Sequence, residues 1–187
     1  MSIDAADIID DRRIHANVWR DVFDNLDPSV RLEPGCVIYK DCSIGHHSVI
    51  GANAVLRPNT QIGHHSIFGT ASVSEGNCRI GNFTTIHAQC HITQGVTIGD
   101  CCFIAPFFIA TNTPWITLGQ HGTLPSSKPE IRPTVIQDNV RIGANVRMIP
   151  GLTIGHDSEI DQDCLITKDV SPWSHIRGGK DKIGRSI

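Results

Sequence analysis

Large aromatic side chains are scarce in this sequence. They make up 5% of its 187 residues, with a single Tyr and six Phe. An aromatic-rich sandwich core is therefore disfavoured, and one domain with a core of aliphatic side chains is expected. The chain also shows no basic and apolar leader, and no apolar run that approaches a membrane span. We therefore expect a cytoplasmic protein with no membrane partner.

An excess of basic charge is also absent. The formal net charge is −3 at pH 7, and the isoelectric point is near 6.3. Because no overall basic field is present, we expect no nucleic-acid partner. A small-molecule substrate is the better expectation.

Paired cysteine motifs are missing as well, although the chain has seven cysteines. The count is odd and no CxxC occurs. This usage favours reduced thiols in the cytoplasm over a disulfide framework.

What the sequence does contain is a large aliphatic residue at every sixth position through most of its length. Neither the three-to-four spacing of a helix nor the alternation of a strand produces this period, which is typical of a β-solenoid. A single slip in phase indicates an insertion. The series is Leu32, Ile38, Ile44, Ile50, Leu56, Ile62, Phe68, Ser74, Ile80, Ile86, Ile92, Ile98, Ile104 and Ala110, then Ile136, Ile142, Met148, Ile154, Ile160 and Ile166.

Two other positions of each six-residue unit also repeat. Glycine often follows the aliphatic residue, where we expect a tight bend that benefits from the missing Cβ. Small side chains stand four residues after the aliphatic and are expected to point inward. Cysteines in this slot are interpreted as structural, with Cys101 left over. The glycines are Gly45, Gly51, Gly63, Gly69, Gly81, Gly99, Gly143 and Gly155, and the cysteines are Cys36, Cys42, Cys78, Cys90, Cys102 and Cys164.

This pattern is the hexapeptide repeat, and residues 30–176 resemble the left-handed parallel β-helix acyltransferase family. The resemblance implies an all-β fold in which three hexads form one triangular coil of 18 residues. Stacked coils then lie about 4.8 Å apart, with backbone pairing from coil to coil. The resemblance also implies a homotrimer.

Three segments lie outside this rhythm. Residues 1–29 carry Ile14, Val18, Val22 and Leu26 at four-residue spacing, which predicts a short helical cap over the open end of the solenoid. Residues 111–134 are rich in Pro, Gly, Ser and Thr, which predicts an extruded loop. Residues 177–187 form a C-terminal tail with a local excess of Lys and Arg, which implies an anionic ligand.

Two longer motifs narrow the resemblance. The run DNVRIGANVRMIPGLTIG with TKDVSPWS is similar to the late coils of acetyl-CoA-dependent hexapeptide acetyltransferases. The run IHAQCHITQGVTIGDCCFIAPFFIATNTPW is similar to N-acetyltransferases that acylate the amine of nucleotide-linked amino sugars. The resemblance implies acetyl-CoA as co-substrate and substrate-binding positions at Gln94 and Asn112. Gln94 departs from the Glu or Asp of that family.

The coil period places further polar residues near this pair. Gln94 and Asn112 are 18 residues apart, so they lie one above the other. Glu75 begins an adjacent outward column that continues with Thr93 and Thr111. We predict that Glu75 also belongs to the substrate-binding set at the root of the loop.

Direct transfer to an amine requires a base that accepts a proton near neutrality, which suits histidine. We predict His91, on the same face as Glu75, as that base, with His87 as a second catalytic candidate. His121, in the loop, is a candidate for the base and for substrate binding. The resemblance also implies contacts to acetyl-CoA from Gly143, Ala144, Thr167, Lys168, Lys182 and Arg185.

Three other functions stay open. Sugar O-acetyltransferases of this fold carry a His-Pro pair where this chain has Thr113-Pro114, which argues against the maltose or galactoside subgroup but leaves O-acetylation of a glycan precursor possible. The γ-class carbonic anhydrases bind a metal between subunits through three histidines, two of them five apart, whereas His87 and His91 are four apart. A non-catalytic scaffold subunit is the third alternative.

A histidine doublet occurs twice at the spacing of one coil. His46-His47 and His64-His65 are therefore expected to stack on one edge of the early coils, where they could hold a metal. Paired histidines at an exposed corner usually face water, and we expect no metal.

Overall fold

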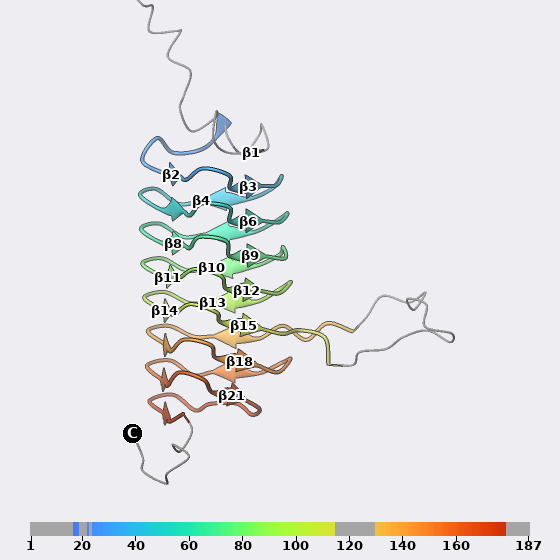
Figure 1. Ribbon diagram of the computed structural model, residues 1–187, viewed down its shortest axis with the longest axis vertical. Coiled ribbons are helices and arrows are strands. Elements are labelled where there is room, and N and C mark those ends of the chain that lie inside the picture. Colours follow the sequence, from blue (N-terminus) through green and yellow to red (C-terminus); the bar gives the residue numbers. More distant parts are fainter. Residues whose placement is uncertain (1–16, 19–21, 23, 115–129, 179–187) are drawn as a thin grey trace, which may run out of the picture.

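The computed structural model describes residues 17–18, 22, 24–114 and 130–178. In these residues the chain winds as a left-handed parallel β-helix whose coils stack along one axis (Figure 1). Each coil has three short strands separated by tight corners, as the six-residue period predicts. The all-β fold expected from the sequence is confirmed.

Three parallel sheets run along the prism, and we name them faces A, B and C. Each described strand pairs with the equivalent strand one coil away, so that Ile86, for example, pairs with Ile104. Face A contains β1 (Asn17–Val18), β3 (Val37–Ile38), β6 (Val55–Leu56), β9 (Val73–Ser74), β12 (His91–Ile92), β15 (Ile109–Ala110), β18 (Arg147–Met148) and β21 (Leu165–Ile166). Face B contains β2 (Arg31–Leu32), β5 (Val49–Ile50), β8 (Ile67–Phe68), β11 (Thr85–Ile86), β14 (Phe103–Ile104), β17 (Arg141–Ile142), β20 (Glu159–Ile160) and β22 (His175–Ile176). Face C contains β4 (Ser43–Ile44), β7 (Gln61–Ile62), β10 (Arg79–Ile80), β13 (Thr97–Ile98), β16 (Val135–Ile136) and β19 (Thr153–Ile154).

The chain passes from face B to A, from A to C and from C back to B, and we name the corners between them the B–A, A–C and C–B edges. The second residue of most strands points into the prism, and Ile50, Leu56 and Ile86 have no exposed surface. The small-residue slots are buried too. Ser74 interrupts the aliphatic series and buries a hydroxyl group. A hydrogen bond of 2.8 Å between this hydroxyl and Oγ1 of Thr60 offsets the cost of its burial.

The repeated glycines have a different role from the expected one. The corners bend at residues in the left-handed region two positions later, such as His47 with a φ of 57° and Asn53 with a φ of 56°. Gly63 itself is required because a Cβ there would lie 2.6 Å from the backbone N of Asn82 in the next coil. Close stacking of coils, rather than the bend, therefore excludes a side chain at this position.

The seven cysteines are all unpaired. Six of them are buried in the inward slots, as predicted, and Cys101 is exposed. Burial raises the pKa of the Cys36 and Cys102 thiols to about 11. These thiols are therefore protonated near neutral pH and serve as core side chains.

The N-terminal segment differs from the expected helix at Asn17–Val18. Asn17–Val18 form strand β1, which pairs with β3 and extends face A by one strand. The first coil presents unpaired backbone groups at its edge, and a strand satisfies them where a helix could not. Val22 is helical and buried, and Leu26 packs on the core, so these two of the predicted apolar side chains cover the end. Ile14 lies outside the described residues.

The hexad rhythm is interrupted once, between β15 and β16. Face C nevertheless continues across the interruption, because Thr97 in β13 pairs with Val135 in β16. The described residues of the predicted loop, 111–114 and 130–134, form no strand, so the chain departs from the hexad pattern at the A–C edge after β15 and resumes it at β16. Residues 115–129 lie outside the described residues. No helix among the described residues has the length and apolar character needed to cross a bilayer.

Candidate functional site

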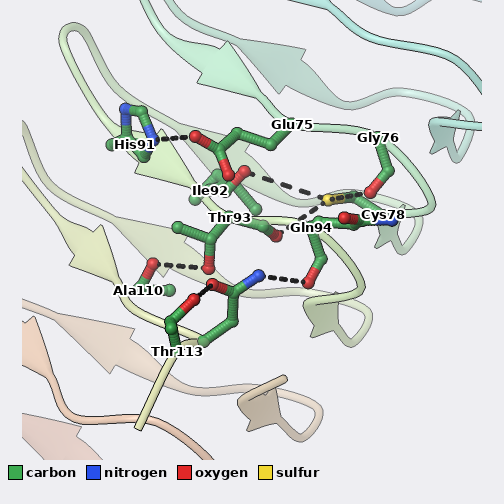
Figure 2. Close-up of polar contacts among 10 residues, drawn as sticks. Glu75, Gly76, Cys78, His91, Ile92, Thr93, Gln94, Ala110 and Thr113 are labelled. Atoms are coloured by element: carbon green, nitrogen blue, oxygen red, sulfur yellow. Dashed lines mark hydrogen bonds and ion pairs between the residues drawn. The ribbon is translucent and has the colours of Figure 1, made fainter. Parts of the chain in front are cut away.

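The proposed base and a carboxylate meet on face A. His91 is the outward residue of β12, and Glu75 directly follows β9 one coil earlier. Nε2 of His91 lies 2.9 Å from Oε1 of Glu75 (Figure 2). The side chains are 43% and 35% exposed, so the pair is accessible from solvent. A carboxylate that accepts Nε2–H orients the imidazole and leaves Nδ1 free to accept a proton.

Beside this pair, the root of the loop is held by polar contacts between coils. Nδ2 of Asn112 donates to the backbone carbonyl of Gln94 at 2.9 Å, and Oγ1 of Thr93 donates to the carbonyl of Ala110 at 2.8 Å (Figure 2). Oγ1 of Thr113 donates to Oδ1 of Asn112 at 3.1 Å. The chain entering the loop is therefore attached to the coil before it.

These contacts change the expected roles of two residues. Asn112 is 7% exposed, and both ends of its amide are engaged within the protein. We expected the side chains of Gln94 and Asn112 to lie one above the other. The side chain of Asn112 instead forms a hydrogen bond with the backbone carbonyl of Gln94. Thr93 is buried rather than outward, because its hydroxyl satisfies a carbonyl of the next coil.

The other histidine candidates lie elsewhere. His87 follows β11 at the B–A edge, and its ring lies 4.9 Å from that of Phe103 in an edge-on arrangement. Within the described part of the chain, His87 makes no hydrogen bond or ring contact with His91 or Glu75. His121 lies outside the described residues. Of the predicted bases, His91 alone is paired with a carboxylate in the described structure.

A groove of about 800 Å³ opens along the late coils at the B–A edge. It contains Gly143, which the sequence predicts as a cofactor contact. Both signs of charge line it, with Asp161 accepting from Nε2 of His175 at 2.8 Å. This hydrogen bond lowers the pKa of Asp161, helped by the backbone N–H of Gly178 and the charge of Arg177. The lining residues are Phe103, Arg141, Ile142, Gly143, Glu159, Ile160, Asp161, Gln162, Asp163, His175, Arg177 and Gly178.

The remaining predicted cofactor residues are not gathered in this groove. Ala144 adjoins it, and its carbonyl accepts from the backbone N–H of Asp163 at 2.9 Å. Thr167 and Lys168 are exposed after β21 at the A–C edge, a different corner of the prism. Lys182 and Arg185 lie outside the described residues.

Sequence reasoning missed most residues of the groove, among them Arg141 and His175. Both are first residues of face B strands, so they point outward in the same column as Phe103. Following that outward column across the insertion would have found them.

A β-helix built from six-residue units, interrupted at one edge, is the fold of hexapeptide-repeat proteins. Comparison with known proteins agrees with this class. The family model "Bacterial transferase hexapeptide (six repeats)" matches residues 26–58 and 77–107. In these segments the chain carries the hexapeptide repeat of that family, and it is similar to acetyltransferases built on this repeat.

Individual relatives cover parts of the chain. A chloramphenicol acetyltransferase of Agrobacterium fabrum is 34% identical over 77 residues, which are 41% of this chain and 34% of that protein. A hexapeptide-repeat acetyltransferase of Vibrio cholerae, solved with acetyl coenzyme A, is 28% identical, with a TM-score of 0.51 over 61% of this chain and 63% of that one. The chain thus spans about a third of that curated relative.

A third comparison concerns the fold alone. An N-acyltransferase of Bacillus cereus, solved with dTDP-4-amino-4,6-dideoxyglucose and coenzyme A, is 15% identical. Its TM-score is 0.56 over 85% of each chain.

Proposed function

We propose that this protein transfers the acetyl group of acetyl-CoA to the amine of a nucleotide-linked amino sugar. The observation that carries the proposal is the 2.9 Å contact between His91 and Glu75, exposed on face A at the root of the loop. The Vibrio cholerae relative solved with acetyl coenzyme A supports the acyl donor. The motif around Gln94 and Asn112 supports the amino-sugar acceptor.

The chemistry assigned to this pair is general base catalysis. The amine attacks the thioester carbonyl, a C–N bond forms, and the C–S bond breaks. Nδ1 of His91 accepts the proton that the amine loses and returns it to the departing thiolate. Glu75 holds the ring in the tautomer that leaves Nδ1 unprotonated and stabilises the cation that forms. Asn112 is a positioning residue, because it attaches the loop to the coil that carries Gln94.

The groove at the B–A edge fits a long anionic donor. It follows the stacked coils past Gly143, and Arg141 and Arg177 place guanidinium groups in its wall. Guanidinium groups suit the phosphates of coenzyme A, and the apolar Phe103 and Ile160 suit its uncharged arm. We therefore assign donor binding to this groove, with Ala144 at its border.

The distribution of outward side chains supports a homotrimer. Faces A and B expose apolar side chains, among them Ile109 and Leu165 on A and Ile67 and Phe103 on B. The outward positions of face C are mostly polar: Ser43, Gln61, Arg79, Thr97 and Thr153. In this assembly, faces A and B meet between protomers and face C contacts water.

The trimer also explains how residues on two corners serve one donor. Gly143 and Lys168 lie on different edges of the same prism, and a groove between protomers brings one edge of each together. We propose that Thr167 and Lys168 of one protomer complete the donor site of its neighbour. The unpaired state of all seven cysteines supports a location in the reducing cytoplasm.

The decisive test is calorimetric titration with acetyl-CoA, followed by a coupled thiol-release assay on a panel of nucleotide-linked amino sugars. Micromolar binding of one donor per chain and release of CoA with an amino sugar, but not with the matching hydroxy sugar, are expected. Transfer only to hydroxyl groups would replace the proposal with O-acetylation. Absence of donor binding would exclude an acetyltransferase and favour a scaffold role.

A further inference from the structure

Four histidines form a compact cluster at the C–B edge of the early coils, away from the proposed acetyl-transfer site. The rings of His46 and His64 stack with centroids 4.9 Å apart, and those of His47 and His65 stack at 4.8 Å. Neighbouring rings within each doublet meet edge-on at 5.2 and 5.4 Å. The two doublets therefore form one group of imidazoles rather than separate surface side chains.

The backbone holds this arrangement in place. His47 and His65 occupy the same corner position in successive coils, with φ values of 57° and 53°. The backbone N–H of His65 donates to the carbonyl of His46 at 2.9 Å, and that of His47 donates to Oγ of Ser29 at 2.8 Å. Equal backbone geometry one coil apart directs the two rings the same way, so the cluster is ordered before any ligand binds.

The ligating atoms converge. One ring nitrogen from each of His46, His47 and His65 lies within 4.8 Å of the others, and all three residues are exposed. Zn²⁺ binds imidazole nitrogens at about 2.0–2.1 Å, a distance that rotation of exposed side chains can reach. Three histidines leave a fourth tetrahedral position for water or an exogenous ligand.

The ring of His64 belongs to the same stack, although it is not one of the three converging ligands. Its Nδ1 is buried with no hydrogen-bond partner in the described part of the chain, so the cluster contains an imidazole nitrogen that the described protein leaves unsatisfied.

The next coil completes the environment. The ring of Phe83 stacks on that of His65 at 5.2 Å and meets His64 edge-on at 4.9 Å. The ring of Phe83 therefore covers one side of the His65 ring and limits how far it can turn. Asp27 brings a carboxylate to the same corner, because its Oδ1 accepts from Oγ of Ser29 at 2.6 Å and that Oγ accepts from the backbone N–H of His47.

We propose that His46, His47 and His65 bind one divalent late transition-metal ion per chain, of the class of Zn²⁺, Ni²⁺ or Cu²⁺. Imidazole donors suit these ions and do not suit Mg²⁺ or Ca²⁺. The ion joins two adjacent coils beside the N-terminal end of the solenoid, and so it stabilises the fold rather than taking part in acetyl transfer. The site departs from the expectation that the protein holds no metal.

The test is a titration of chelator-treated protein with Zn²⁺, and with Mg²⁺ for comparison, by calorimetry and by thermal unfolding. All proteins carry Cys101→Ser, which removes the exposed thiol as a competing ligand. The variants are His47→Asn and His65→Asn, singly and together. Asparagine occupies this left-handed position at Asn53, Asn59 and Asn139, so the corner is kept. The control is His156→Asn, a half-exposed histidine on the same edge in a later coil.

The parent and the control are expected to bind one Zn²⁺ per chain and to gain thermal stability from Zn²⁺ but not from Mg²⁺. Each single variant is expected to bind Zn²⁺ at least about tenfold more weakly, since even the loss of a supporting partner costs 10- to 100-fold. The double variant is expected to lose the stability gain. Equal Zn²⁺ binding by the parent and the double variant, or no saturable binding by the parent, would overturn the proposal.

Discussion

Glu75 and His91 come from successive coils and meet at 2.9 Å, although 16 residues separate them in sequence. Each side chain is placed by its own strand, β9 or β12, and the two strands pair in register through Val73 and His91. The contact therefore depends on how the coils stack. Whatever preserves the register of face A preserves the geometry of the proposed base.

Replacing His91 by Ala is expected to lower kcat for acetyl transfer by about 10²–10⁴-fold, because the general base is removed. Glu75→Gln is expected to lower kcat less and to leave the KM for acetyl-CoA unchanged, since Glu75 positions the imidazole. Steady-state kinetics on the two variants check this, with His156→Ala, a half-exposed histidine at the C–B edge, as the control and His87→Ala as the test of the other candidate base. A His91→Ala enzyme within a few-fold of wild type would remove His91 as the base.

The pair of Asp161 and His175 predicts how stability depends on pH. The pKa of Asp161 is lowered in the fold, so its carboxylate stabilises the folded state above the ordinary value of 3.8, and this contribution is lost as the pH falls through the folded value. Asp161→Asn is therefore expected to lower the urea midpoint at pH 7, with a difference from wild type that shrinks toward pH 3. Glu159→Gln, a change to an exposed carboxyl in the same groove, serves as the control. A difference of equal size at both pH values would contradict the assignment.

Two neighbouring residues of β11 allow the contribution of core packing to stability to be compared with that of a surface side chain. Ile86 is fully buried, while Thr85 points outward. Ile86→Ala is expected to lower the free energy of unfolding by about 2–5 kcal/mol, because it removes buried methyl groups and leaves a cavity. Thr85→Ala, one position earlier, is expected to change it by less than about 0.5 kcal/mol. Chemical denaturation of both variants measures the contrast, and similar losses would mean that the inward and outward positions are misassigned.

Thiol chemistry offers an independent check on the core. Cys101 is exposed, whereas the other six cysteines are buried and burial raises the pKa of Cys36 and Cys102 to about 11. A thiol reagent at pH 8 is expected to modify one cysteine per native chain and all seven after unfolding. Native Cys101→Ser protein is the control and should not react. Rapid modification of several thiols in the native protein would show that the inward slots are open.

Much of the architecture could be predicted from the sequence, for a simple physical reason. A residue that recurs every six positions occupies the same position in each strand. The period alone therefore predicts which side chains point into the prism. Ile50, Ile86 and Ile104 are buried where the period places them. The break after Ala110 is also visible in the sequence, because Pro and Gly cannot continue the pattern.

The six-residue period also predicts which residues stack on one another in successive coils. It does not explain which positions must be glycine for the coils to stack. The 18-residue coil predicts that His46 lies above His64 and His47 above His65, and the rings stack in these pairs. The period could not explain the repeated glycines, because Gly63 is limited by the backbone of Asn82 in the next coil. That contact exists only once two coils lie together.

The composition of the candidate site was decided by the tertiary structure. Sequence spacing gives the angular position of a residue on the prism, but not its side-chain rotamer or the partner that satisfies it. Thus Asn112 turned inward to the backbone of Gln94, while His91 rather than His87 found a carboxylate. Likewise, Phe103 and Arg141 share a groove only because β14 and β17 pair in register on either side of the interruption between β15 and β16. The sequence by itself determined the solenoid and its inward residues through local periodicity, and only the packing of coil on coil decided which polar groups meet.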